Sequence, residues 1–86
     1  MYGVEFSQKA KRSLRNLPND VRDGILNRIN ELASNPVCEK GLKGRLQGGL
    51  CRARVGDYRI IYSIDHEHRT IRIIDVGKRE NIYERL

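Results

Sequence analysis

The stretch that decides the fold runs from residue 50 to residue 62 and reads LCRARVGDYRIIY. It contains two β-prone segments with alternating side chains, separated by Gly56 and Asp57. A glycine-containing pair between two such segments predicts a β-hairpin with a two-residue loop. We therefore expect one strand over Leu50–Val55 and another over Tyr58–Asp65.

A two-residue loop also fixes which residues lie opposite each other across the hairpin. The expected pairs are Val55 with Tyr58, Arg54 with Arg59, Ala53 with Ile60, and Arg52 with Ile61. Opposite side chains share a face of the sheet. One face should then pack against helices through Cys51, Ala53, Val55, Tyr58, Ile60 and Tyr62.

The other face of the hairpin should present Arg52, Arg54 and Arg59 together. Like charges placed opposite each other destabilise a sheet, so three guanidinium groups without a carboxylate indicate an external anion. Phosphate fits, because guanidinium offers a fixed fork of donors to its oxygens. The alternative is that these arginines pair with acids elsewhere in the fold, and a longer loop would shift the register and remove the argument.

The charge distribution favours a polyanionic partner. The formal net charge is +6, and residues 40–59 contain six cations and one acid. Such a basic segment is typical of proteins that bind nucleic acid or an acidic protein. A solvated charged face is the alternative interpretation.

The N-terminal half predicts one strand and a helical hairpin. Residues Tyr2–Phe6 alternate as a short strand, and Ser7 is suited to cap the following helix. Pro18 separates this helix from a second one, which Ser34-Asn35-Pro36 ends. The buried stripes are expected at Ala10, Leu14 and Leu17 in the first helix, and at Val21, Ile25, Ile29 and Leu32 in the second.

The remaining chain predicts a loop over Val37–Gly49 and a last strand over Thr70–Val76, after a turn around residues 65–68. Segregated helices and strands indicate an α+β fold in the order β-α-α-β-β-β, with the helical hairpin packed on one face of an antiparallel four-stranded sheet. The 86 residues have room for a single domain, 1–86.

The composition favours a globular protein of the cytoplasm. Hydrophobic residues make up 38% and charged residues 33% of the chain. No apolar run approaches membrane-spanning length, and the first residues lack the pattern of a secretory signal. We therefore expect a cytoplasmic location and no membrane partner.

The cysteines and histidines are expected to carry no chemistry. A disulfide between Cys38 and Cys51 is left open, but two thiols in an unsecreted chain are expected to be reduced. His66 and His68 fall in a predicted turn, without Cys or His residues at zinc-ligand spacing. We expect neither a metal nor a cofactor.

Three motifs and one tyrosine carry a family resemblance: LKGRL (42–46), RARVGDYRIIY (52–62) and VGKR (76–79), followed by Tyr83. Together they resemble the RelE family of toxins. The order of strand, helical hairpin and meander matches that family over nearly the whole chain. RelE-type toxins are messenger RNA endonucleases that act in the ribosomal A site and are held inactive by an antitoxin. The resemblance implies this fold, and a ribosome-dependent endoribonuclease of a type II toxin–antitoxin system.

The resemblance also implies the site residues. Arg52 and Arg54 match the paired basic residues of the family's second strand, Arg59 the arginine of its third strand, Arg79 the arginine after its fourth strand, and Tyr83 its C-terminal tyrosine. These five are the expected catalytic residues. Contacts to RNA are expected from Lys43, Arg45 and Lys78, for which a solvated surface is the alternative.

One position departs from the family pattern. Family members often have lysine where this chain has Arg52 or Arg54, and arginine is a poor general base because it stays protonated. Tyr83 is therefore the candidate base, and its alternative reading is a residue that covers the core.

Two other functions remain as alternatives to RNA cleavage. A ParE-like toxin shares the fold but inhibits DNA gyrase by binding, and a non-catalytic module would bind only RNA or antitoxin. The expected partners are a RelB-like antitoxin whose acidic and apolar side chains cover the basic face, and the ribosome with its mRNA. Operator DNA is expected only through the antitoxin complex.

Overall fold

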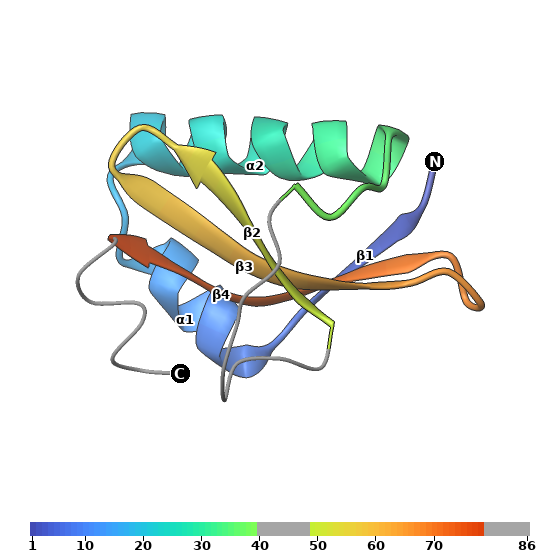
Figure 1. Ribbon diagram of the computed structural model, residues 1–86. Helices are drawn as coiled ribbons and strands as arrows, with labels where there is room; N and C mark the ends of the chain where they lie inside the picture. The colour runs from blue at the N-terminus through green and yellow to red at the C-terminus, as the bar shows by residue number, and fades with distance from the viewer. Residues whose placement is uncertain (40–48, 79–86) are drawn as a thin grey trace.

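The computed structural model describes residues 1–39 and 49–78. The strands there are β1 (Gly3–Phe6), β2 (Leu50–Val55), β3 (Tyr58–Asp65) and β4 (Thr70–Lys78), and the helices are α1 (Gln8–Arg15) and α2 (Asn19–Ser34). The strands form one sheet in the order β1-β4-β3-β2, with α2 lying across it (Figure 1). The expected α+β architecture and element order are confirmed.

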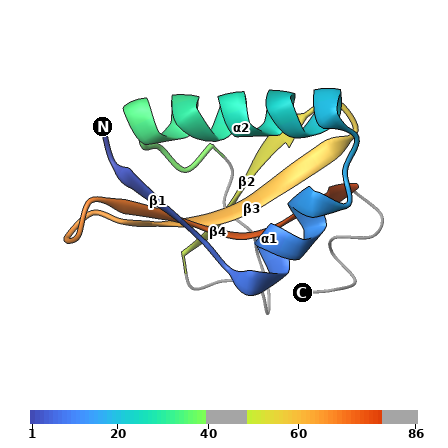
Figure 2. The ribbon, with the colours of Figure 1, turned by 180° about the vertical axis from the view of Figure 1, so that it is seen from behind.

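One strand joins the sheet in a direction that the sequence did not predict. β2, β3 and β4 pair antiparallel, but β1 runs parallel to β4, with Gly3 opposite Thr70 and Phe6 opposite Ile73. The sheet is therefore mixed. Short turns force the last three strands to alternate in direction, whereas β1 is followed by two helices and is free of that constraint. Figure 2 shows β1 beside β4, with α1 continuing from its end.

Both helices begin close to the predicted positions. Ser7 Oγ accepts a hydrogen bond from the backbone N–H of Ala10 at 2.9 Å and donates one to the carbonyl oxygen of Ile74 at 2.6 Å. The residue that caps α1 thus also ties it to β4. α2 starts directly after Pro18 and ends at Ser34. No helix among the described residues is long and apolar enough to cross a membrane.

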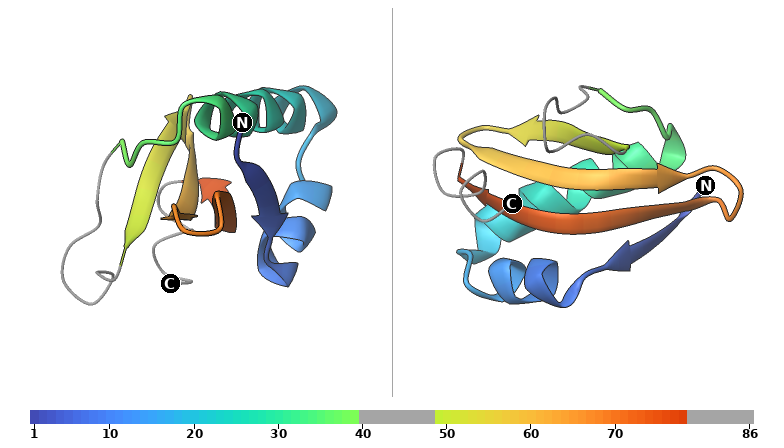
Figure 3. Two further views of the ribbon diagram at one scale, coloured as in Figure 1. Left: turned by 90° about the vertical axis from the view of Figure 1, so that its right-hand side faces the viewer. Right: turned by 60° about the horizontal axis from the view of Figure 1, so that its bottom comes forward.

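The core lies between the helices and one face of the sheet. Figure 3 shows α2 running across the sheet. The predicted helical stripes are confirmed, because Ala10, Leu14, Ile25, Ile29 and Leu32 are all buried, and Leu17 and Val21 pack against them partly exposed. The sheet contributes Cys51, Ala53, Ile60, Tyr62, Ile71, Ile73 and Val76. Full burial of one such aliphatic side chain contributes about 1.5–3 kcal/mol, so this layer holds the hairpin in place.

The segment after α2 is bonded to the sheet through a disulfide. The expectation that both thiols are reduced was therefore wrong. Cys38 and Cys51 form a disulfide with Cα atoms 5.4 Å apart. On either side of Cys38, the Tyr62 hydroxyl donates to the carbonyl oxygen of Val37 at 2.8 Å and accepts from the N–H of Glu39 at 3.1 Å. Glu39 also forms an ion pair with Arg28. Residues 37–39 are therefore held by covalent, hydrogen-bonding and ionic contacts.

Candidate nucleic-acid interface

The β2–β3 hairpin has the predicted register. Arg54 lies opposite Arg59, Arg52 lies opposite Ile61, and Val55 lies opposite Tyr58. The loop is the two-residue turn Gly56-Asp57, and Gly56 has a φ of +57°. This left-handed conformation is costly for residues with a Cβ, so glycine supplies what the tight turn requires. The three arginines consequently lie on the face of the sheet that points away from the helices.

Two of these arginines converge on a single backbone atom. The Nε of Arg54 donates to the carbonyl oxygen of Gly56 at 3.1 Å, and the Nη1 of Arg59 reaches the same oxygen at 3.5 Å. Arg59 Nη1 also donates to the carbonyl oxygen of Tyr58 at 3.2 Å. Uncharged carbonyl groups thus fix the two guanidinium groups without neutralising them.

Arg59 is a buried cation that lacks a full set of partners. It is 6% exposed, and its buried Nε has no hydrogen-bond acceptor in the part of the chain that the structure describes. Within residues 1–39 and 49–78, no carboxylate forms an ion pair with Arg54 or Arg59; the ion pairs formed there involve other cations. Leaving a buried donor unsatisfied costs about 1–3 kcal/mol, and more for a charged group. An oxyanion bound here would recover that free energy.

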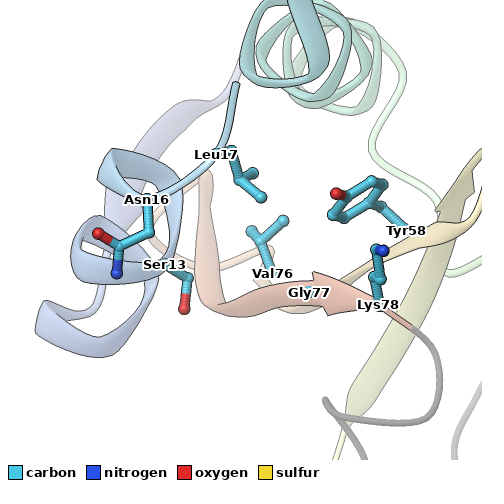
Figure 4. Close-up of a pocket in the computed structure, with 7 residues that line it drawn as sticks. All are labelled: Ser13, Asn16, Leu17, Tyr58, Val76, Gly77 and Lys78. Atoms are coloured by element: carbon cyan, nitrogen blue, oxygen red, sulfur yellow. The ribbon is translucent and has the colours of Figure 1, made fainter. Parts of the chain in front are cut away.

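Arg52 and Lys78 differ in their placement. Arg52 is partly buried on the same face as Arg54 and Arg59. Lys78 pairs with Tyr58, so it belongs to the helix-facing side of the sheet, where a pocket of about 230 Å³ opens (Figure 4). The pocket is lined by Ser13, Asn16, Leu17, Tyr58, Val76, Gly77 and Lys78. The structure therefore does not group Lys78 with the arginines.

Four of the predicted site residues fall outside the described part of the chain: Lys43, Arg45, Arg79 and Tyr83. The roles of Lys43 and Arg45 remain predictions from the sequence, and those of Arg79 and Tyr83 remain predictions from the resemblance.

Both histidines lie at the opposite end of β3 from the arginines. His66 Nδ1 is 2.8 Å from the Tyr2 hydroxyl, and His68 Nδ1 is 2.7 Å from Asp65 Oδ2. A hydrogen bond from the backbone of His68 lowers the pKa of Asp65, and a hydrogen bond from the His68 side chain lowers it further by a smaller amount. Asp65, Glu67 and His68 bring one potential ligand atom each to within 4.8 Å of one another, but all three are exposed in a turn. Exposed groups of this kind commonly pair among themselves, as Asp65 and His68 do.

Sequence reasoning missed one buried polar group, Asp75. Its carboxylate is fully buried, accepts hydrogen bonds from Ser13 Oγ and from the N–H of Val76 at 2.8 Å each, and lies 3.8 Å from Lys9 Nζ. Next to Asp75 the register of β3 and β4 shifts, because Ile61 pairs with Asp75 but Tyr62 pairs with Ile73, which leaves one extra residue in β4. The available signal was an acid within an otherwise apolar strand.

Comparison with known proteins agrees with this geometry. A family model described as the ParE toxin of type II toxin–antitoxin system, parDE, matches residues 4–83. Toxin RelG of Mycobacterium tuberculosis is 36% identical over 86 residues, which cover 98% of each chain. The mRNA interferase toxin RelE of Escherichia coli is 29% identical over 80 residues, which cover 92% of this chain and 84% of the relative.

A solved structure is also similar to this chain. A chain of the crystal structure of the toxin–antitoxin complex RelBE2 from M. tuberculosis matches with a TM-score of 0.81 and 35% identity. The match covers 91% of this chain and 98% of that chain. Because the family model and these relatives span nearly the whole sequence, the protein belongs to the RelE/ParE superfamily and is a RelE-family toxin of a type II toxin–antitoxin system.

Proposed function

We propose that this toxin is a ribosome-dependent endoribonuclease that cleaves mRNA in the ribosomal A site and thereby stops translation. The observation that carries the proposal is the pair Arg54–Arg59. These two cations lie opposite each other and form no ion pair with a carboxylate within residues 1–39 and 49–78. The name of the E. coli relative, mRNA interferase toxin RelE, supports the same activity. RNA supplies the phosphates that such a pair would bind.

The proposed reaction is attack of a ribose 2′-hydroxyl on the adjacent phosphate: a bond forms between the 2′-oxygen and phosphorus, the P–O5′ bond breaks, and the products are a 2′,3′-cyclic phosphate and a 5′-hydroxyl. The 2′-hydroxyl gives up its proton to a base, and the leaving 5′-oxygen takes one up. The protein must orient the RNA and stabilise the charge that grows on the phosphorane. Arg54 and Arg59 perform these two tasks, because their positions are fixed before RNA binds. Arg52 approaches the RNA from the same face of the hairpin.

Arg79 and Tyr83 complete the proposed site on the strength of the family resemblance. Arg79 neutralises the phosphate or the leaving oxygen. Tyr83 stacks on a base or transfers a proton. We assign the base role to Tyr83, because positions 52 and 54 hold arginine, a residue type that makes a poor general base. Lys43 and Arg45 are proposed contacts to the RNA backbone. Lys78 lies on the helix-facing side of the sheet, so its proposed contact is to a part of the RNA away from the three arginines.

The proposed protein partner is a RelB-like antitoxin. The similar chain in the RelBE2 structure from M. tuberculosis was solved in a toxin–antitoxin complex. We call the face of the sheet that carries Arg52, Arg54 and Arg59 the arginine face. An antitoxin segment with acidic and apolar side chains would cover the arginine face and block the binding of RNA. We propose that operator DNA is reached only through this complex, and that toxin and antitoxin act in the cytoplasm.

A ParE-like activity is the second candidate, because the matching family model is described as a ParE toxin. Such a toxin inhibits DNA gyrase by binding and needs no cleavage chemistry. The purified protein should be incubated in parallel with programmed ribosomes and with gyrase on supercoiled DNA. Cleavage in the A-site codon without gyrase inhibition is the expected result. Gyrase inhibition without mRNA cleavage would replace our proposal with the second candidate.

A further inference from the structure

The shared carbonyl oxygen of Gly56 engages Arg54 and Arg59 through different atoms. A guanidinium group has a side-on edge, formed by Nε and Nη2, and an end-on edge, formed by Nη1 and Nη2. In Arg59 the two carbonyl contacts both use Nη1, so the side-on edge remains, and its buried Nε has no hydrogen-bond partner within residues 1–39 and 49–78. In Arg54 the carbonyl uses Nε, so the end-on edge remains.

The position of the Gly56 carbonyl oxygen, which accepts from both arginines, is fixed by the turn. Gly56 adopts a φ of +57°, and the loop has only two residues between Val55 and Tyr58. In such a turn the direction of each carbonyl follows from the backbone conformation. The Gly56 carbonyl therefore points to one place whenever the hairpin is formed.

We propose that Gly56 is a positioning residue whose carbonyl oxygen presents the side-on edge of Arg59 and the end-on edge of Arg54 to one phosphate group. This inference rests on the proposed function, since it assumes that the phosphate belongs to RNA. Each edge donates two parallel hydrogen bonds to an oxyanion, and two edges from adjacent strands contact different oxygens of the same phosphate. Lysine at either position would supply charge without a defined edge.

The proposal predicts different behaviour for the two Nε–H groups. In ¹⁵N-labelled protein, the Arg54 Nε–H should exchange with solvent roughly five- to tenfold more slowly than that of Arg72, as expected for one added hydrogen bond. Inorganic phosphate should shift the Nε–H resonance of Arg59 and leave that of Arg54 in place. Arg54→Lys and Arg59→Lys variants assign the two resonances.

A change in the turn tests whether Gly56 causes this difference. An extra glycine between Gly56 and Asp57 moves the carbonyl while keeping both arginines, and the Arg54 Nε–H should then exchange like that of Arg72 and respond to phosphate. An extra glycine between Glu67 and His68 is the matched control and should change neither resonance. Melting temperatures identify any variant that has lost the fold.

Three results would overturn the inference. They are rapid exchange of the Arg54 Nε–H in the unaltered protein, no effect of the turn insertion on it, or no response of the Arg59 Nε–H to phosphate. None of these measurements uses RNA or ribosomes. A protein that shows the expected resonances but cleaves no mRNA would leave the positioning role standing and refute the proposed function.

Discussion

Arg59 and Arg72 lie on the same face of the sheet, but only Arg72 has a carboxylate partner among the described residues. Arg72 Nη2 is 3.3 Å from Glu5 Oε2, whereas the hydrogen bonds of Arg59 within residues 1–39 and 49–78 go to the carbonyl oxygens of Gly56 and Tyr58. Arg72 is thus paired with an acid within the fold, and Arg59 has no such partner in this part of the chain. This contrast supplies a matched control for tests of the arginine face.

Arg59→Lys should lower kcat for mRNA cleavage by about two orders of magnitude or more, the loss typical of removing one transition-state donor. Lysine preserves the charge but cannot donate from a planar edge. Single-turnover kinetics on programmed ribosomes would measure the effect. Arg72→Lys should stay within about twofold of the unaltered toxin, because surface ion pairs contribute little. Equal activity of the two variants would show that charge alone suffices at position 59.

Loss of the disulfide should lower the free energy of unfolding by about 3 kcal/mol, because the bond closes a loop across a sequence separation of 13 residues. Urea denaturation with and without dithiothreitol would measure the loss. The double variant Cys38→Ser with Cys51→Ser should match the reduced protein and ignore dithiothreitol. An unaltered protein that is indifferent to the reductant would mean that the bond does not stabilise the fold.

Ser13→Ala should destabilise the protein by about 1–3 kcal/mol, since it removes a donor from the buried Asp75 carboxylate. Ser63→Ala is the control. Ser63 is partly exposed on β3, and its loss should stay within about 0.5 kcal/mol. Chemical denaturation of both variants is the measurement. A Ser13→Ala protein as stable as the control would argue that the other contacts of Asp75 are sufficient.

Stability should fall at alkaline pH because of Tyr62. Burial raises the pKa of its hydroxyl above 10.0, and the opposing effect of Arg28 is smaller. A raised folded-state pKa means that the contribution is fully present below pH 10.0 and is lost as pH rises through the folded-state pKa. Melting temperatures between pH 8 and 11 should fall less steeply for Tyr62→Phe, although that variant starts lower because it loses the contacts to Val37 and Glu39. Parallel curves for the two proteins would refute this assignment.

The hairpin and its arginine face could be predicted because their geometry is local. A two-residue turn and a side-chain period of two are enough to place Arg54 opposite Arg59. The helical stripes follow equally from a local period.

Other features depend on contacts between distant segments. The parallel pairing of β1 with β4 is not set by any turn, and the bond between Cys38 and Cys51 depends on how the segment after α2 returns to β2. The register shift next to Asp75 is marked by no local pattern. These features arise when the elements pack, so the spacing of residues along the chain does not reveal them.

We propose that the face carrying Arg52, Arg54 and Arg59 binds RNA and promotes its cleavage. The most direct measurement maps cleavage in the A-site codon of programmed ribosomes for the unaltered toxin, Arg59→Ala and Arg72→Ala at equal concentration. We expect Arg59→Ala to abolish cleavage, and Arg72→Ala to cleave at the same positions as the unaltered toxin. Undiminished cleavage by Arg59→Ala, with melting temperatures confirming that both variants are folded, would contradict it.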